Sequence, residues 1–147
     1  MLDDPPKTRL GPALILAQEH WRRAVEQVMA AQGAPPIWAS VEVLARLTPE
    51  GVSQALLAER MGLSKQAVQQ FLDQLEALAL IRRESDPADK RAKRVFITEA
   101  GMVALTTRRE AERQADRQMR DILGRKNFDR LKKALGKLSA APASTPG

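Results

Sequence analysis

The sequence predicts a mainly α-helical protein that carries one small β-hairpin. Three observations support this fold class. Residues 54–73 contain two short helical patterns separated by a glycine, and residues 82–98 contain a turn flanked by strand-forming residues. Apolar residues also recur at helical spacing before and after these segments, over about residues 12–31 and 99–123.

The first segment, QALLAERMGLSKQAVQQFLD, has the spacing of two helices joined by a tight turn. Gly62 stands at the turn, where a positive φ favours a residue without a β-carbon. Ser64 is a good N-cap for the second helix, and we expect Leu63 to pack under the turn. Ala58 is small enough for the second helix to cross closely above it. These residue types fit a helix-turn-helix; the alternative is an ordinary helical hairpin with a solvated polar face.

Each of the two helices has an apolar side and a polar side. The positions predicted to be buried are Leu57, Ala58, Met61, Val68, Phe71, Leu72 and Leu75. The polar side of the second helix consists of Ser64, Lys65, Gln66, Gln69 and Gln70. Because a Gln amide can bond bidentately to N6 and N7 of adenine, this side is a candidate surface for reading DNA bases.

The second segment, RRESDPADKRAKRVFIT, predicts a basic β-hairpin. Pro87 fixes φ at the turn, and the Asp side chains on either side can cap backbone N–H groups. Val95, Phe96 and Ile97 supply the returning strand, and Thr98 can cap a following helix. Four cations crowd the tip, Lys90, Arg91, Lys93 and Arg94. Beside a helix-turn-helix they favour contact with phosphates or a minor groove; the alternative is a solvated loop.

Residues 57–101 resemble the winged-helix core of the MarR family of bacterial transcription regulators. The most specific part, DPADKRAKRVFITEAG, is similar to the family's wing signature through Asp89, Arg91, Thr98 and Gly101. A looser resemblance covers about residues 10–140. It implies a winged helix-turn-helix with a β-hairpin wing, flanked by N- and C-terminal dimerisation helices, in an obligate homodimer. It also implies that Arg91 reaches the minor groove and that Asp89 helps to hold it in place.

Three features depart from the family's pattern. The recognition helix offers Lys65 and three Gln residues where the family often has Arg, so base preference cannot be transferred. Ala79 stands where the family usually has Gly; if φ is positive there, Ala costs on the order of 1 kcal/mol. The chain has no cysteine, which excludes the thiol-based peroxide sensing of one branch of the family.

The helices outside the core show apolar faces that their own chain is not expected to cover. Gly33, Pro35 and Pro36 end the first helix, and Asn127 is expected to cap the last one. A second helix is predicted from Ile37, Val41, Leu44 and Leu47, and a thin apolar stripe on residues 99–123 from Ala111, Ala115, Met119 and Ile122. The expected dimer contacts are Leu14, Trp21, Val25, Phe128, Leu131, Leu135 and Leu138. The alternative is a compact monomer in which these helices fold back.

Composition agrees with this interpretation. The chain has 147 residues, enough for one domain with a real core, and its net charge of +6 favours a polyanionic partner. No apolar run approaches the ~20 residues that a membrane span requires. The start, MLDDPPKTRL, lacks the cationic and apolar regions of a secretory signal. We therefore expect a cytoplasmic protein.

Enzyme chemistry finds no support in the sequence. His20 is the only histidine and has no Cys or acidic partner at metal-ligand spacing. A helix would point Glu19 and His20 in different directions. There is no phosphate-binding Gly loop and no nucleophile elbow. We expect no catalytic residue, metal or cofactor.

The sequence thus predicts a sequence-specific DNA-binding transcription regulator, most simply a repressor, that acts as a homodimer on a pseudo-palindromic operator. The resemblance implies a small-molecule effector in a pocket between the dimer helices and the winged helix, which Trp21 or Trp38 could line. The alternative is a winged-helix protein-interaction module that does not read DNA. The expected organisation is an N-terminal dimerisation region (1–33), a DNA-binding core (34–100), linking and dimerisation helices (101–140) and a disordered tail (141–147).

Overall fold

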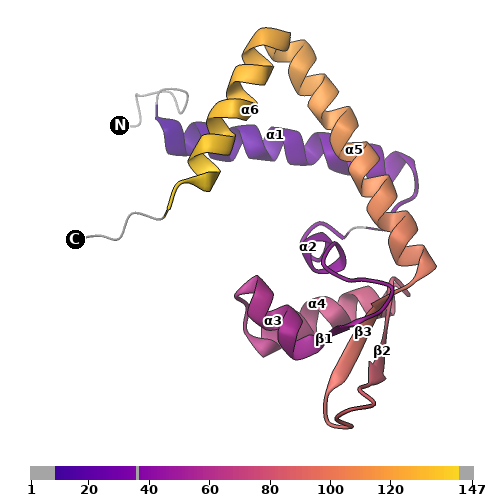
Figure 1. The fold of residues 1–147 in the computed structure, drawn as a ribbon. Helices are drawn as coiled ribbons and strands as arrows, with labels where there is room; N and C mark the ends of the chain where they lie inside the picture. The colour runs from indigo at the N-terminus through magenta and orange to yellow at the C-terminus, as the bar shows by residue number, and fades with distance from the viewer. Residues whose placement is uncertain (1–8, 36, 143–147) are drawn as a thin grey trace, which may run out of the picture. The chain divides into compact units, whose positions relative to one another are not determined.

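The computed structural model describes residues 9–35 and 37–142, which contain several helices and one small antiparallel sheet (Figure 1). The elements in chain order are α1 (Leu10–Ala31), α2 (Val41–Leu44), β1 (Val52–Ser53), α3 (Gln54–Met61), α4 (Lys65–Ala77), β2 (Ile81–Ser85), β3 (Lys93–Ile97), α5 (Glu99–Leu123) and α6 (Arg125–Ala140). The predicted fold class, mainly α with a β-hairpin wing, is confirmed. Within the described ranges, no helix has the length and apolarity needed to cross a membrane.

The chain forms two compact units, and the division between them falls inside two helices. Residues 26–111 make up one unit, which we call the winged-helix unit. Residues up to 25 and from 112 onward make up the other, which we call the helical unit. The domain boundaries predicted from the sequence lie elsewhere and stay predictions. Most of the predicted disordered tail, residues 143–147, lies outside the described residues.

The sheet of the winged-helix unit has the strand order β1-β3-β2. The β2–β3 hairpin is the predicted wing, with Ile81 opposite Ile97 and Ser85 opposite Lys93. The sequence analysis missed β1, in which Val52 pairs with Val95 of β3. A strand of two residues cannot show the alternation that reveals longer strands, so only its distant partner identifies it.

The helix-turn-helix has the turn and the cap that the sequence predicts. Gly62 has φ +62° and ends α3, and Ser64 Oγ accepts a hydrogen bond of 3.1 Å from the Ala67 N–H at the start of α4. The prediction that Leu63 packs under the turn is wrong, because its side chain is exposed. The turn is closed through the main chain instead, by the Leu63 N–H bound to the Ala58 carbonyl at 3.1 Å.

The core of the winged-helix unit gathers apolar residues from its helices and strands. Buried members from the predicted stripes are Leu57, Ala58, Val68, Leu72 and Leu75, and Val95 joins them from β3. Met61 and Phe71, also predicted to be buried, are half-buried. The predicted burial is therefore confirmed for most residues of the two stripes, whereas Met61 and Phe71 are only partly buried.

The second predicted helix is much shorter than expected. Only Val41–Leu44 is α-helical, although Ile37, Val41, Leu44 and Leu47 are all buried. The chain leaves the helix through tighter turns, with the Arg46 N–H bound to the Val43 carbonyl and the Leu47 N–H to the Leu44 carbonyl. Burial at helical spacing therefore does not require a regular helix in this segment.

Thr98 and Gly101 hold together the junction of α4 with the wing. Ala79 has φ +57°, the positive value considered above, and is the one non-glycine residue with positive φ among those described. Thr98 Oγ1 donates to the Ala79 carbonyl at 2.7 Å and accepts from the Gly101 N–H at 3.1 Å. A β-carbon on Gly101 would lie 2.1 Å from the Leu80 carbonyl oxygen. Thr98 is thus the predicted cap, and only glycine fits the close approach.

The helical unit contains the first part of α1, the second part of α5, and α6. Trp21 on α1 donates from Nε1 to Asp116 Oδ1 on α5 at 2.9 Å. Along the predicted stripe of α5, Ala111 and Ala115 are buried, whereas Ile122 is exposed. Within the helical unit, the Trp21–Asp116 hydrogen bond thus links α1 to α5.

The predicted cap of the last helix is wrong. The helix α6 begins at Arg125 with Gly124 as the N-cap residue, so Asn127 lies within its first turn. Asn127 Nδ2 donates instead to the carbonyl of Leu123, the last residue of α5, at 3.1 Å. The positive φ of Gly124, +77°, lets the chain turn before Asn127 is reached.

Candidate nucleic-acid interface

The polar side of α4 presents side chains at the surface of the winged-helix unit. Lys65, Gln66 and Gln70 are exposed, as is the capping residue Ser64. The Gln66 and Gln70 amides make no hydrogen bond to any other described residue. Each amide therefore keeps a donor and an acceptor available for a base edge.

Gln69 differs from the two other glutamines of α4. Its Oε1 accepts from Gln54 Nε2 of α3 at 2.6 Å, and its Nε2 donates to Asp73 Oδ1 at 2.8 Å. The side chain is half-buried. Both ends of the amide are therefore occupied within the protein, and reading adenine would require breaking both bonds. The available sequence signal was Asp73, which lies four residues after Gln69 on the same helix, whereas Gln54 is brought to it by folding.

Arg83 of the wing also bonds to this side of α4. The sequence analysis missed this residue. Arg83 on β2 donates from Nη2 to Asp73 Oδ1 at 2.7 Å, and it pairs with Glu76 through Nε at 3.1 Å and through Nη2. These hydrogen bonds from Arg83 lower the pKa of Glu76 below its ordinary value. The bond to Glu76 in turn raises the pKa of Arg83. The spacing of Asp73 and Glu76, three apart on one helix face, was the available signal.

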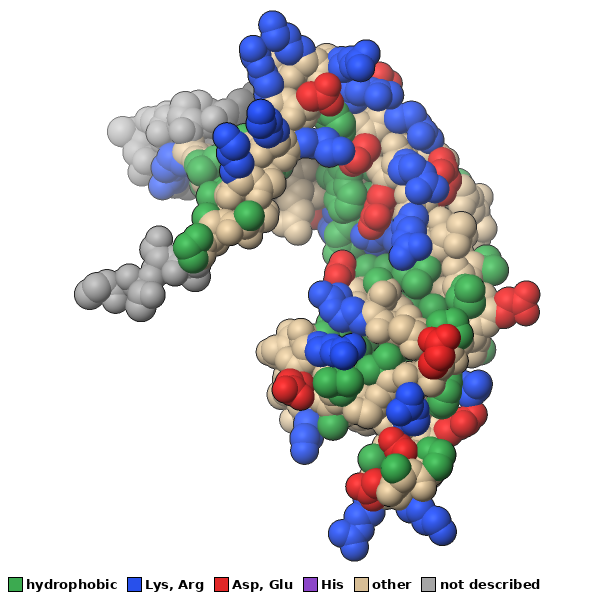
Figure 2. Space-filling view, in the orientation of Figure 1, with side chains coloured by type: hydrophobic (Ala, Val, Ile, Leu, Met, Phe, Trp, Pro, Cys, Tyr) green, Lys and Arg blue, Asp and Glu red, His purple; other side chains and the backbone are tan. Residues whose placement is uncertain are grey.

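The wing tip is held by the turn chemistry that the sequence predicts. Asp86 Oδ1 accepts from the Ala88 N–H at 2.9 Å, and Asp89 Oδ1 accepts from the Arg91 N–H at 3.0 Å. Asp89 thus holds Arg91 through its main chain. The side chains of Lys90 and Arg91 are exposed. Figure 2 shows Lys and Arg side chains at the free end of the wing.

The other two predicted tip cations lie on β3 rather than in the turn. Lys93 is exposed, while Arg94 is half-buried. Arg94 Nη2 donates to the carbonyl of Gly51 at 2.7 Å and to that of Glu50 at 3.1 Å. Its guanidinium therefore braces the loop before β1 and is engaged by the protein. Of the four cations, Lys90 and Arg91 are the ones at the tip.

The predicted dimer residues fall into two groups. Leu131 and Leu138 on α6 are 42% and 57% exposed, and α6 buries none of its residues. Leu14, Trp21, Phe128 and Leu135 are half-buried. Val25, by contrast, is 0% exposed within the single chain. The apolar face of α6 is thus available to a partner, and Val25 is already covered.

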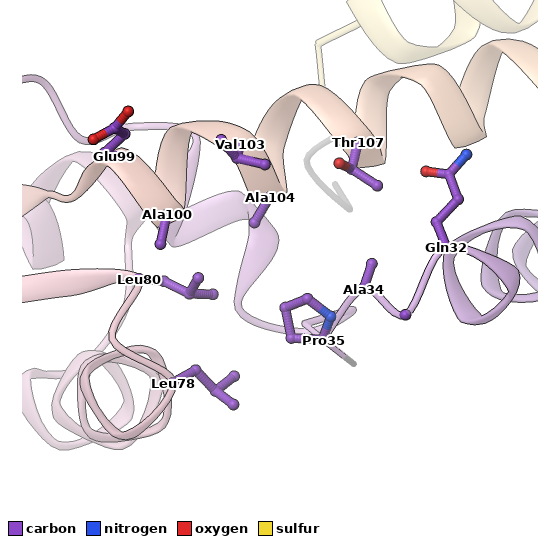
Figure 3. A pocket seen from close by; sticks show the side chains of 11 residues that line it. Gln32, Ala34, Pro35, Leu78, Leu80, Glu99, Ala100, Val103, Ala104 and Thr107 are labelled. Carbon is purple, nitrogen blue, oxygen red and sulfur yellow. The ribbon is translucent and has the colours of Figure 1, made fainter.

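Two hollows lie within the winged-helix unit. The larger, of about 640 Å³, has α5 on one side and the α4–β2 junction with the loop after α1 on the other (Figure 3). The smaller, of about 210 Å³, is lined by Trp38, Arg108, Met29 and Ile37 among others. Arg108 is only 4% exposed, and its guanidinium lies 4.0 Å from the centre of the Trp38 ring. Of the two tryptophans considered for a pocket, Trp38 lines one.

A comparison with known protein families identifies the winged-helix unit. Residues 35–92 match the model of a family described as the MarR family. Over these residues the winged-helix unit is therefore similar to the MarR family. This family consists of transcription regulators, and the matched residues include α3, α4 and most of the wing.

Solved structures of MarR-family proteins share the fold over nearly the whole chain. The transcriptional repressor CouR, solved bound to a 23-mer DNA duplex, is 26% identical, with a TM-score of 0.71 over 90% of this chain and 94% of that one. Wild-type MarR from E. coli in its apo form is 18% identical, with a TM-score of 0.68 over 88% and 96%. CouR from Rhodococcus jostii RHA1, solved with p-coumaroyl-CoA, is 21% identical, with a TM-score of 0.66 over 97% and 100%.

Proposed function

We propose that this chain is a sequence-specific DNA-binding transcription regulator of the MarR family that acts as a homodimer. One observation carries the proposal. The second helix of a helix-turn-helix presents the exposed Gln66 and Gln70 amides, and the same unit carries a wing whose tip exposes Lys90 and Arg91. The similarity to CouR, which was solved on a DNA duplex, supports it.

The two parts of this surface have different roles. The helix α4 enters the major groove, where the Gln66 and Gln70 amides pair with base edges and Lys65 neutralises phosphate. Arg91 enters an adjacent minor groove, whose negative potential is deepest where A·T-rich sequence narrows it. Base contacts select the site, and the cations of the wing supply affinity and orientation.

Homodimerisation follows from the exposed apolar residues of the helical unit. Leu131 and Leu138 on α6, with Leu10, Ile15 and Leu16 on α1, form apolar surface that a second copy can cover. A two-fold axis then presents two recognition helices to one inverted repeat. Bound at a promoter in the bacterial cytoplasm, such a dimer acts as a repressor. No catalytic residue, metal or cofactor enters this mechanism.

A small-molecule effector fits the smaller hollow. Its walls are largely apolar, while the buried Arg108 places a cation against the Trp38 ring. Glu26 also lines the hollow, so the lining carries both charges and suits a small, largely apolar ligand. The complex of CouR with p-coumaroyl-CoA indicates that this fold accommodates a ligand.

A protein-interaction module is the second candidate function. Such a module would present apolar or acidic groups at the wing tip and on α4. The exposed residues there include Lys65, Lys90 and Arg91, together with Gln66 and Gln70. The exposed carboxylates of α4, Asp73 and Glu76, are paired with Arg83. The charge of this surface therefore favours DNA.

Selection of bound duplexes from a random-sequence pool tests the proposal. A regulator should enrich one inverted repeat, and its affinity for that duplex should fall steeply as salt rises. A protein that enriches no sequence, or that elutes from a duplex column at low salt, is not a sequence-specific regulator. The enriched duplex then serves as the operator in the experiments below.

A further inference from the structure

Five side chains form one continuous bonded cluster across three elements of the winged-helix unit. We call this cluster the α4 clamp; its members are Gln54, Gln69, Asp73, Glu76 and Arg83. Gln54 lies at the start of α3 and Arg83 lies on β2. The other three members lie on α4, so the clamp ties the recognition helix to α3 on one side and to the wing on the other.

We propose that Arg83 is a positioning residue for base reading, which holds α4 at a set position relative to the wing. The inference rests on the proposed function, because it concerns how the DNA-reading surface is arranged. Arg83 reaches Asp73 directly and Gln69 through Asp73, with three consecutive bonds of 2.7, 2.8 and 2.6 Å leading to Gln54. The Gln69 amide is thus bonded within the clamp, and Gln66 and Gln70 are the glutamines of α4 that we expect to read bases.

The exposure of the paired groups supports a positioning role. The Arg83 side chain is 15% exposed, whereas that of Asp73 is 57% exposed. The guanidinium is therefore held against α4 by its carboxylate partners and is not offered to a phosphate. The lowered pKa of Glu76 and the raised pKa of Arg83 have the same cause, the hydrogen bonds between them.

The position of α4 relative to the wing matters because, in the proposed complex, α4 and the wing enter two grooves of the DNA at the same time. The Gln amides contact base edges only when α4 lies at the correct depth and rotation, and side-chain recognition tolerates errors of about 0.5 Å. The backbone link between α4 and β2 is short and includes Ala79 at positive φ. Arg83 adds a second connection between the same two elements. Its loss should therefore impair discrimination between sequences more than general affinity for DNA.

The neighbouring Arg82 provides a matched control. It lies on the same strand and carries the same charge, but its guanidinium lies 4.2 Å from the centre of the Phe96 ring and pairs with Glu84. Arg82→Ala and Arg83→Ala change the net charge equally, and only Arg83→Ala breaks the clamp. The difference in DNA binding between the two variants therefore measures the effect of positioning without that of charge.

The experiment measures the affinity of each full-length variant for the enriched duplex and for a scrambled duplex of equal length. We expect Arg83→Ala to lower the ratio of the two affinities by about tenfold. Arg82→Ala should lower both affinities by the same factor and leave the ratio unchanged. Arg83→Lys should fall between wild type and Arg83→Ala, because an ammonium cannot reproduce the forked contact with two carboxylates.

Asp73→Ala keeps the inference testable if Arg83→Ala folds poorly. The position is exposed and helical, and alanine is the best helix former, so this variant should fold. Removing a carboxylate should also favour DNA in general, so scrambled-duplex affinity should hold or rise while the ratio falls. A role confined to stability would lower the melting temperature and both affinities together.

The outcomes separate this inference from the proposed function. A wild-type protein that prefers no duplex overturns both. If the wild type is selective but Arg83→Ala and Asp73→Ala change the affinity ratio no more than Arg82→Ala does, Arg83 is not a positioning residue and the inference alone is overturned.

Discussion

Asp89 Oδ1 accepts a hydrogen bond of 3.0 Å from the backbone N–H of Arg91 at the tip of the wing. The carboxylate therefore shapes the turn that carries the arginine and leaves the guanidinium exposed. This arrangement assigns the two residues separate tasks. In the proposed interface Arg91 contacts the DNA, and Asp89 fixes the backbone from which it extends.

Arg91→Ala should weaken operator binding and flatten its dependence on salt. Each phosphate interaction lost should reduce the slope of log affinity against log salt by about 0.9. Affinity measured over a series of salt concentrations provides both values. An unchanged affinity and slope would remove Arg91 from the interface.

Two substitutions of Asp89 should separate its backbone role from its charge. Asp89→Asn and Asp89→Ala both remove the carboxylate charge, but only Asn keeps an oxygen that can accept from the Arg91 N–H. We expect Asp89→Asn to bind the operator more tightly than Asp89→Ala does. Equal weakening of both variants would indicate that the charge is what matters.

Gln70→Ala should cost about 1–3 kcal/mol in binding to the operator and little in binding to a scrambled duplex. The Gln70 amide is exposed, and its donor and acceptor can both pair with adenine. Equilibrium titrations of the two duplexes give the two losses. Gln118→Ala, at an exposed position of α5, is the control and should change neither. Equal losses on both duplexes would show that Gln70 reads no base.

Leu131→Asp combined with Leu138→Asp should split the homodimer. Both side chains are exposed in the single chain, so the substitutions leave its own core intact, while a carboxylate buried without a partner in a dimer seam costs several kcal/mol. Sedimentation should show a monomer, and operator affinity should fall sharply. Lys133→Asp, on the opposite face of α6, should remain a dimer.

The dimer prediction also fixes the geometry of the operator. Two recognition helices related by a two-fold axis should meet half-sites whose centres lie about 10 bp apart, or a multiple of that distance. A monomeric double variant that bound the full operator as tightly as wild type would show that dimerisation is not needed to find the site.

Ala79→Gly should stabilise the protein by about 1 kcal/mol, because the strain of a β-carbon at φ +57° is removed. The melting temperature should rise by a few degrees when measured at a fixed protein concentration. Ala77→Gly, in the last turn of α4, is the control and should destabilise, since glycine is a poor helix former. A destabilised Ala79→Gly variant would mean that the Ala79 side chain contributes more through packing than it costs in strain.

The sequence by itself determined the features whose bonding partners lie a few residues apart. Ser64 caps α4 three residues onward, Thr98 caps α5 three residues onward, and Asp89 closes a turn two residues onward. Such bonds follow from local residue type, so the helix-turn-helix, the wing and the start of α5 could all be predicted. Gly62 belongs with them, because its positive φ is a property of the turn itself.

Only the tertiary structure decided which polar side chains remain available for DNA. Gln69 and Gln70 are equivalent in the sequence pattern, but Gln54 and Asp73 occupy the first and leave the second exposed. Arg94, which belongs to the same basic run as Arg91, bonds to the carbonyls of a loop more than forty residues earlier. Gln54 and the loop carbonyls come from elements that folding brings together, and no local pattern encodes these contacts, whereas Asp73 lies only four residues from Gln69 on α4. The sequence shows which polar and charged residues are present. Which of their side chains bond within the protein, and which stay exposed for a partner, depends on how the elements pack.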